Sequence, residues 1–114
     1  MFVEERRKIE AEYPMPLATF DQYMAHLLHA LEVAGPEHVG ISGDFDGGGG
    51  VEGLMSVADM PRITTALLAA GYTAEDLKNI WGGNTLRAMR AAEDYAKSLS
   101  PEAWGATPSG KNDA

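Results

Sequence analysis

The most constraining feature of this chain is a short apolar run that ends in two aspartates and four glycines, residues 39–50. Val39 and Ile41 alternate with small residues, a pattern typical of a buried β-strand. Asp44 would lie at the carboxyl end of that strand, where α/β proteins gather ligands and chemistry. The glycines allow a sharp turn and a close approach to a ligand. The sequence therefore predicts a strand over 38–43, followed by an acidic glycine-rich loop.

The two aspartates of this loop have two interpretations. A carboxylate at Asp44 or Asp46 can bind a metal, accept a proton or pair with a substrate amine. Aspartate and glycine are also the commonest turn residues, so the same letters can describe a polar turn. The glycines over 48–53 match a dinucleotide-binding pattern, but the preceding acids would repel a pyrophosphate, and we reject that interpretation.

The rest of the chain is predicted to be helical. A short charged helix should cover Phe2–Tyr13, and a clear amphipathic helix should follow Thr19, which with Gln22 forms a capping box. Gly35 and Pro36 should end that helix. Three further helices are expected over residues 61–70, 74–80 and 85–99. Pro61 suits the first turn of one of them, and the residues from Thr73 to Asp76 look like the cap of the next.

The corner before the last helix contains Gly82 and Gly83, which should break the chain there. We expect the Asn84 side chain to cap the last helix, a structural role. The apolar residues of that helix are expected to face inward: Leu86, Met89, Ala92, Ala96 and Leu99.

A single buried strand is a problem for an isolated chain. Its backbone donors and acceptors are exposed on both edges, and each unpaired buried group is costly. This chain supplies one strand and about five helices, so the strand's partners must come from other sequence or from another chain. We infer that this chain is the carboxyl-terminal piece of a larger α/β protein. A homo-oligomer that pairs its lone strands is the less favoured alternative.

Charge and composition exclude several classes of function. The chain has 114 residues and a formal net charge of −8, which argues against nucleic acid and against an anionic membrane surface as partners. It contains no cysteine, which excludes disulfides and is compatible with a cytoplasmic location. We expect residues 1–99 to form the folded part. Residues 100–114 are expected to be a disordered tail with a contact through Trp104.

The other polar candidates are weaker. His26 and His29 are three residues apart on a helix, a spacing that suits a metal, but both are expected on its polar, solvated face. His38 precedes the predicted strand and should cap or pack. The arginines are most simply surface charges: Arg62, Arg87 and Arg90.

The run from His38 to Gly47 resembles the signature near the carboxyl terminus of the membrane (renal) dipeptidase family, the zinc peptidases of family M19. The segment 26–35 is similar to the family's helix before the last barrel strand. The segments 61–70, 72–77 and 83–87 resemble the closing part of the family. The resemblance covers about Thr19 to Leu99, and Met1–Tyr13 resembles a preceding insert in bacterial members.

This resemblance implies the fold of a (β/α)8 metal-dependent hydrolase barrel, of which the chain would hold the eighth strand and the helices around it. Family members hydrolyse dipeptides at a site with two zinc ions. Asp44 matches a family aspartate that accepts a proton and pairs with the amino group of the substrate. Asp46, Gly47 and Asn84 are expected in second-shell or structural roles.

The departure from the family pattern is large, because the family's zinc ligands come from earlier strands that this chain lacks. We therefore expect the isolated chain to be inactive, mostly helical, and prone to self-association or homo-oligomer formation through exposed barrel surface. The alternative is a small helical interaction module whose acidic glycine-rich loop binds a cation or a partner without catalysis.

Overall fold

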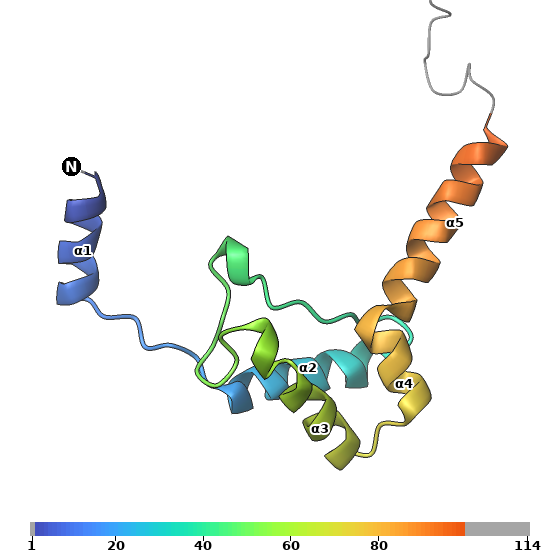
Figure 1. Cartoon of the computed structure of the whole chain (residues 1–114), viewed down its shortest axis with the longest axis horizontal. Helices are drawn as coiled ribbons and strands as arrows, with labels where there is room; N and C mark the ends of the chain where they lie inside the picture. The colour runs from blue at the N-terminus through green and yellow to red at the C-terminus, as the bar shows by residue number, and fades with distance from the viewer. Residues whose placement is uncertain (1, 100–114) are drawn as a thin grey trace, which may run out of the picture.

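The computed structural model of the chain describes residues 2–99, and these residues are mainly helical (Figure 1). The α-helices are α1 (Phe2–Glu12), α2 (Phe20–Ala34), α3 (Pro61–Ala69), α4 (Ala74–Lys78) and α5 (Asn84–Ser98). Two 3₁₀ turns, η1 (Phe45–Gly47) and η2 (Val57–Asp59), lie between α2 and α3, and a π-helical turn, η3 (Asn79–Gly83), joins α4 to α5.

The predicted strand over 38–43 is wrong for this chain. No strand is present within residues 2–99, and 38–43 belong to an irregular connecting segment, residues 35–44, between α2 and η1. A strand requires a neighbour to share its backbone hydrogen bonds, and the described part of the chain offers none beside this segment. Sheet-like pairing is limited to two isolated bridges, which join Thr19 to Glu52 and Val51 to Leu54. The prediction that the isolated chain is mostly helical is confirmed.

Helix α2 begins and ends where the sequence predicts. The Thr19 hydroxyl accepts a hydrogen bond from the Gln22 backbone N–H at 3.2 Å, and the Gln22 side chain accepts one from the Thr19 backbone at 2.9 Å. These two bonds form the capping box. At the other end Gly35 adopts φ 82° and donates to the Leu31 carbonyl, a conformation that favours glycine.

A small apolar core holds α2, α3 and η3 together. Its most enclosed side chains are Leu54, Ile63, Leu67 and Ile80, each at most 1% exposed. Full burial of such a side chain contributes about 1.5–3 kcal/mol. The other buried apolar residues come from α2, the connecting segment and α4: Met24, Leu27, Leu31, Val39 and Leu77.

Helices α4 and α5 and the turn η3 between them form one kinked helical run. Thr73 caps α4, as predicted, by accepting from the Asp76 backbone N–H at 3.2 Å. At Gly82 the backbone leaves helical geometry, yet the helical run resumes at once. The predicted break is therefore a kink within a nearly continuous helix, so Asn84 caps nothing: α5 has no side-chain cap.

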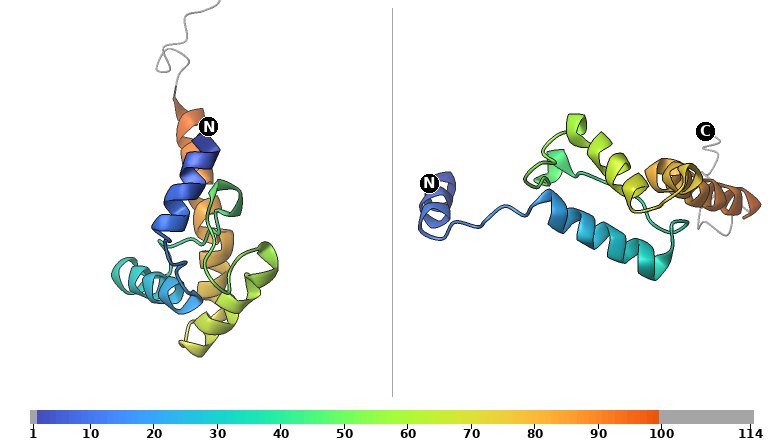
Figure 2. Two further views of the ribbon diagram at one scale, coloured as in Figure 1. Left: turned by 90° about the vertical axis from the view of Figure 1, so that its left-hand side faces the viewer. Right: turned by 90° about the horizontal axis from the view of Figure 1, so that it is seen from below.

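Helices α1 and α5 extend away from this core (Figures 1 and 2). The Cα radius of gyration is 21.7 Å, whereas a compact domain of 100 residues has about 13 Å. Leu86 and Met89 were predicted to face inward, but they are 50% and 55% exposed. Ala92 is exposed too, while Ala96 and Leu99 are only partly buried. The prediction is wrong for this stripe because α5 has no packing partner along it in the described structure.

None of the helices within residues 2–99 combines the length and the apolar character that a membrane crossing requires. The predictions for Trp104 and for residues 100–114 lie outside the described residues.

Candidate functional site

The acidic loop is built around the backbone of Asp44. Asp44 adopts a left-handed conformation with φ 46° and ψ 34°, and it is the one non-glycine residue with positive φ among residues 2–99. Its carbonyl accepts hydrogen bonds from the Gly47 N–H at 3.0 Å and from the Gly49 N–H at 2.7 Å. The loop therefore folds back on Asp44 twice within five residues.

The glycines of this loop are required by the close approach of its own atoms. A Cβ atom at Gly47 would clash with the Asp44 carboxylate, and a Cβ at Gly49 would clash with the Gly43 carbonyl. Gly48 has φ 94°, in the region that favours glycine. A side chain at Gly49 would force the backbone beside Asp44 to move, and one at Gly47 would displace the Asp44 carboxylate. The glycine run thus specifies one geometry for this carboxylate.

The two carboxylates of the loop face solvent while the residue between them is anchored. Asp44 and Asp46 are exposed, whereas Phe45 is partly buried and packs against the apolar core. An ionised carboxylate accepts hydrogen bonds and pairs with cations. The loop can therefore present an acceptor for a proton or for an ammonium group at a fixed place beside the core.

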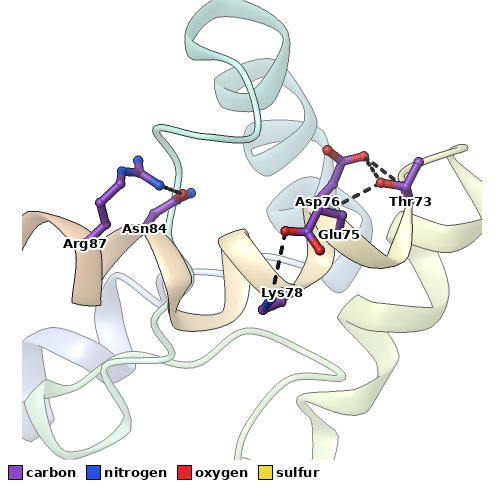
Figure 3. Close-up of polar contacts among 6 residues, drawn as sticks. All are labelled: Thr73, Glu75, Asp76, Lys78, Asn84 and Arg87. Carbon is purple, nitrogen blue, oxygen red and sulfur yellow. Dashed lines mark hydrogen bonds and ion pairs between the residues drawn. The ribbon is translucent and has the colours of Figure 1, made fainter.

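Asn84 holds the other end of the connecting segment. Its side-chain amide donates to the carbonyl of Pro36 at 2.7 Å and to that of Val39 at 2.8 Å. Its Oδ1 accepts from Arg87 Nη1 at 2.9 Å (Figure 3), and Arg87 Nη2 donates to the Glu37 carbonyl. Asn84 is the one buried polar residue of the described structure. Its predicted capping role is wrong, because its side chain bonds residues far away in the sequence.

The three arginines are exposed, as predicted, but two of them have specific partners that the sequence does not reveal. Arg87 has the contacts just described. Arg62 donates to the Gly53 carbonyl, and its guanidinium lies 4.4 Å from the centroid of the Phe20 ring. That cation–π contact ties the start of α3 to the start of α2. Contacts with residues distant in sequence distinguish these two arginines from Arg90.

The residues present do not fit a zinc centre. Zinc sites in proteins use three or four clustered ligands, and no group of three histidine, cysteine, aspartate or glutamate side chains is close enough within residues 2–99. His26 and His29 are exposed on α2. His29 lies 4.0 Å from Glu32, one turn along the same helix. His38 is exposed, and its backbone N–H donates to the Gly35 carbonyl.

The perturbed carboxyl groups of the chain belong to its helix caps. The backbone N–H of Met55 donates to Asp59, and this bond holds the pKa of Asp59 below its usual value. The hydroxyl of Thr73 does the same for the pKa of Asp76. Burial raises the pKa of Tyr23 on α2. These groups stabilise turns and packing, and none of them lies in the acidic loop.

The structure thus places an acidic, solvent-facing loop beside a helical core. A sequence model of the family described as membrane dipeptidase (peptidase family M19) matches residues 3–102, and the chain belongs to this family. The chain is 36% identical over 95 residues to the dipeptidase tcpJ of Claviceps purpurea, covering 80% of this chain and 22% of that protein.

Two further proteins show the same relationship. The dipeptidase ataJ of Aspergillus terreus is 38% identical over 90 residues, which cover 78% of this chain and 22% of ataJ. The crystal structure of the probable dipeptidase PvdM from Pseudomonas aeruginosa matches with a TM-score of 0.61 and 37% identity, over 66% of this chain and 19% of that one. The chain thus spans about a fifth of the length of the relatives it matches.

Proposed function

We propose that this chain is the carboxyl-terminal part of a zinc-dependent dipeptidase and that it contributes the Asp44 carboxylate to the active site. One observation carries the proposal: in a chain of the dipeptidase family, the loop around Asp44 has a geometry that its glycines impose and a carboxylate that faces solvent.

The chemistry assigned to Asp44 follows from its charge and exposure. An ionised carboxylate pairs with the protonated amino group of a dipeptide, and it accepts a proton released during hydrolysis. Asp46, two residues on, is exposed as well, and we assign it a supporting role in the loop. Since residues 2–99 do not fit a zinc centre, we assign zinc binding to sequence outside them.

The isolated chain should therefore not hydrolyse dipeptides. The direct test incubates purified chain with a panel of dipeptides, with and without added Zn²⁺, and follows the release of free amino acids. Zinc-dependent hydrolysis that disappears in the Asp44→Asn variant would show that this chain forms a complete site by itself.

The role of Asp44 is tested in the complete reading frame that contains this segment. Asp44→Asn keeps the shape of the side chain and removes its charge, so kcat/KM for dipeptides should fall by about 10²–10⁴-fold, the range of a lost general base. The matched control is Asp94→Asn, an exposed aspartate on α5, which should leave kcat/KM unchanged. If Asp44→Asn retains full activity, Asp44 has no place in the reaction.

A second candidate is a small helical interaction module without catalysis. It is favoured by the lack of a metal-ligand cluster within residues 2–99 and by an acidic loop that is open to solvent. The genomic sequence discriminates between the two. An in-frame His-x-Asp after a strand-like run, about 250–300 residues upstream on the scale of such a barrel, supports the dipeptidase. A stop codon immediately upstream, with cooperative unfolding of the purified chain, supports the module.

A further inference from the structure

The connecting segment that leads to Asp44 is held by side chains from a distant part of the chain. Asn84 bonds Pro36 and Val39, which lie 48 and 45 residues before it, and Arg87 bonds Glu37, 50 residues before it. We propose that Asn84 and Arg87 are positioning residues for Asp44: together they clamp the start of the segment that carries this carboxylate to the active site. This inference rests on the proposed role of Asp44.

The hydrogen-bond inventory of Asn84 explains why an amide is needed. Both of its side-chain N–H groups donate to carbonyl oxygens of the segment, and its oxygen accepts from Arg87. A carboxylate of the same shape donates nothing, so an aspartate here would lose both bonds to the segment. A buried amide without partners would be costly, and Asn84 is only 8% exposed. The Asn84 side chain therefore donates its hydrogen bonds to the connecting segment and none to its own helix.

Other polar contacts in the same helical run are local by comparison. Thr73 bonds Asp76, and Lys78 pairs with Glu75, each within three residues (Figure 3). Such contacts stabilise the turn or helix that contains them. The contacts of Asn84 do something different, because they fix the start of α5 to a segment that forms no sheet.

Asp44 lies between two anchored points of the chain. Before it, the Val39 side chain is buried and the Val39 carbonyl is bound by Asn84. After it, Phe45 packs against the core. The segment between has no sheet partner within the described residues, so these anchors decide where Asp44 lies. Release of the first anchor should displace the carboxylate while leaving the helical core in place.

Arg87 is the better position to test because its side chain is exposed and its loss should not unfold the core. Arg87→Lys keeps the charge but removes the planar fork that reaches Asn84 and Glu37 together. In the complete enzyme we expect kcat/KM to fall about 10- to 100-fold, the scale of a displacement near 1 Å. Arg90→Lys, an exposed change one turn further along α5, is the matched control and should have no effect.

A double-mutant cycle separates positioning from general support of the fold. If Arg87 and Asn84 act through Asp44, then Arg87→Lys or Asn84→Asp should cost little in an Asp44→Asn background. Equal losses in both backgrounds would show that these residues support the fold without positioning Asp44, and would overturn the inference. Should Asn84→Asp fail to fold, the Arg87→Lys cycle alone decides.

A second measurement does not depend on activity and is made on this chain. NMR should show shifted backbone amide signals over residues 37–46 in Asn84→Asp and Arg87→Lys, but not in Arg90→Lys. Unchanged signals there would overturn the clamp even if the enzyme is active. If the complete enzyme shows no dipeptidase activity, the proposed function fails, and this measurement by itself decides whether the clamp exists.

Discussion

Helices α3 and α5 have the same kind of sequence and different environments. Both carry apolar residues at helical spacing, but α3 buries Ile63 and Leu67 completely, whereas α5 leaves Leu86 and Met89 about half exposed. An apolar stripe predicts that a helix forms and which face needs cover; it says nothing about where that cover comes from. The stripe on α5 finds none among residues 2–99, in a chain that spans about a fifth of its relatives' length.

The same contrast holds for polar contacts. The starts of α2 and α4 are fixed by side chains three residues away, whereas the first residue of α5 uses its side chain to hold the segment before Asp44. The starts of α2 and α4 are thus stabilised by contacts within a few residues, whereas the start of α5 is bonded to a distant segment that leads to the acidic loop.

The largest loss of stability is expected from Ile63→Ala in α3. Because Ile63 is fully buried, the change removes apolar contacts and leaves a cavity, at a cost of about 2–5 kcal/mol in the free energy of unfolding. Urea unfolding followed by circular dichroism measures it. Leu86→Ala in α5 is the control, with an expected change within about 0.5 kcal/mol. Equal losses would mean that α5 is as well packed in solution as α3.

A smaller loss is expected when the cap of α4 is removed. Thr73→Ala deletes the hydroxyl that accepts from the Asp76 backbone N–H, and the free energy of unfolding should fall by about 1 kcal/mol. Thr85→Ala, in the first turn of α5, removes a threonine that forms no cap and should cost less. The same urea experiment compares them, and a larger loss at Thr85 would contradict the assigned roles.

The cap of α4 also predicts a dependence of stability on pH. The Thr73 hydroxyl lowers the pKa of Asp76 in the folded chain, while the pKa in the unfolded chain is about 3.9. This contribution to stability is present above pH 3.9 and is lost as the pH falls through the lowered folded pKa. The urea concentration at the midpoint of unfolding should be measured at a series of pH values from 6 to 2.5. As the pH falls, this midpoint should decrease less steeply for Asp76→Asn than for the unmodified chain. Parallel curves would show that the cap has no ionic component.

The smallest effect on unfolding is expected on the exposed face of α5. Replacing Leu86 and Met89 with lysine should change the free energy of unfolding by no more than about 0.5 kcal/mol, because neither side chain is enclosed. It should nevertheless reduce self-association in sedimentation velocity, because exposed apolar surface drives association. A control variant that carries lysine at Ala91 and Ser98, on another face of α5, should associate like the unmodified chain.

The local features of this fold could be predicted from its sequence. The capping boxes at Thr19 and Thr73, the stop at Gly35 and the proline at the start of α3 are confirmed because each depends on residues within four positions. The buried stripe of α2 follows from its helical spacing in the same way.

The predictions that proved wrong all concern features that depend on distant partners. The strand over 38–43 needs a neighbouring strand, and the inward face of α5 needs a surface to cover it. The hydrogen bonds of Asn84 need carbonyl groups 45 and 48 residues away, and no local sequence pattern indicates such partners. The acidic loop was recognised from its aspartates and glycines, yet the reason for those glycines lies in atoms that would clash around Asp44. The catalytic role of Asp44 and the supporting roles of Asp46, Gly47 and Asn84 in the active site stay predictions.

On the proposed role of Asp44, its left-handed backbone sets stability and catalysis in opposition at one position. That conformation costs most residues about 1–2 kcal/mol and aspartate less than most, and glycine adopts it freely. A library of variants screened for thermal resistance alone should therefore enrich glycine at position 44, and every such winner would have lost the carboxylate. A screen for activity should select the aspartate despite its strain, so the two selections would diverge at this residue before any other in the loop.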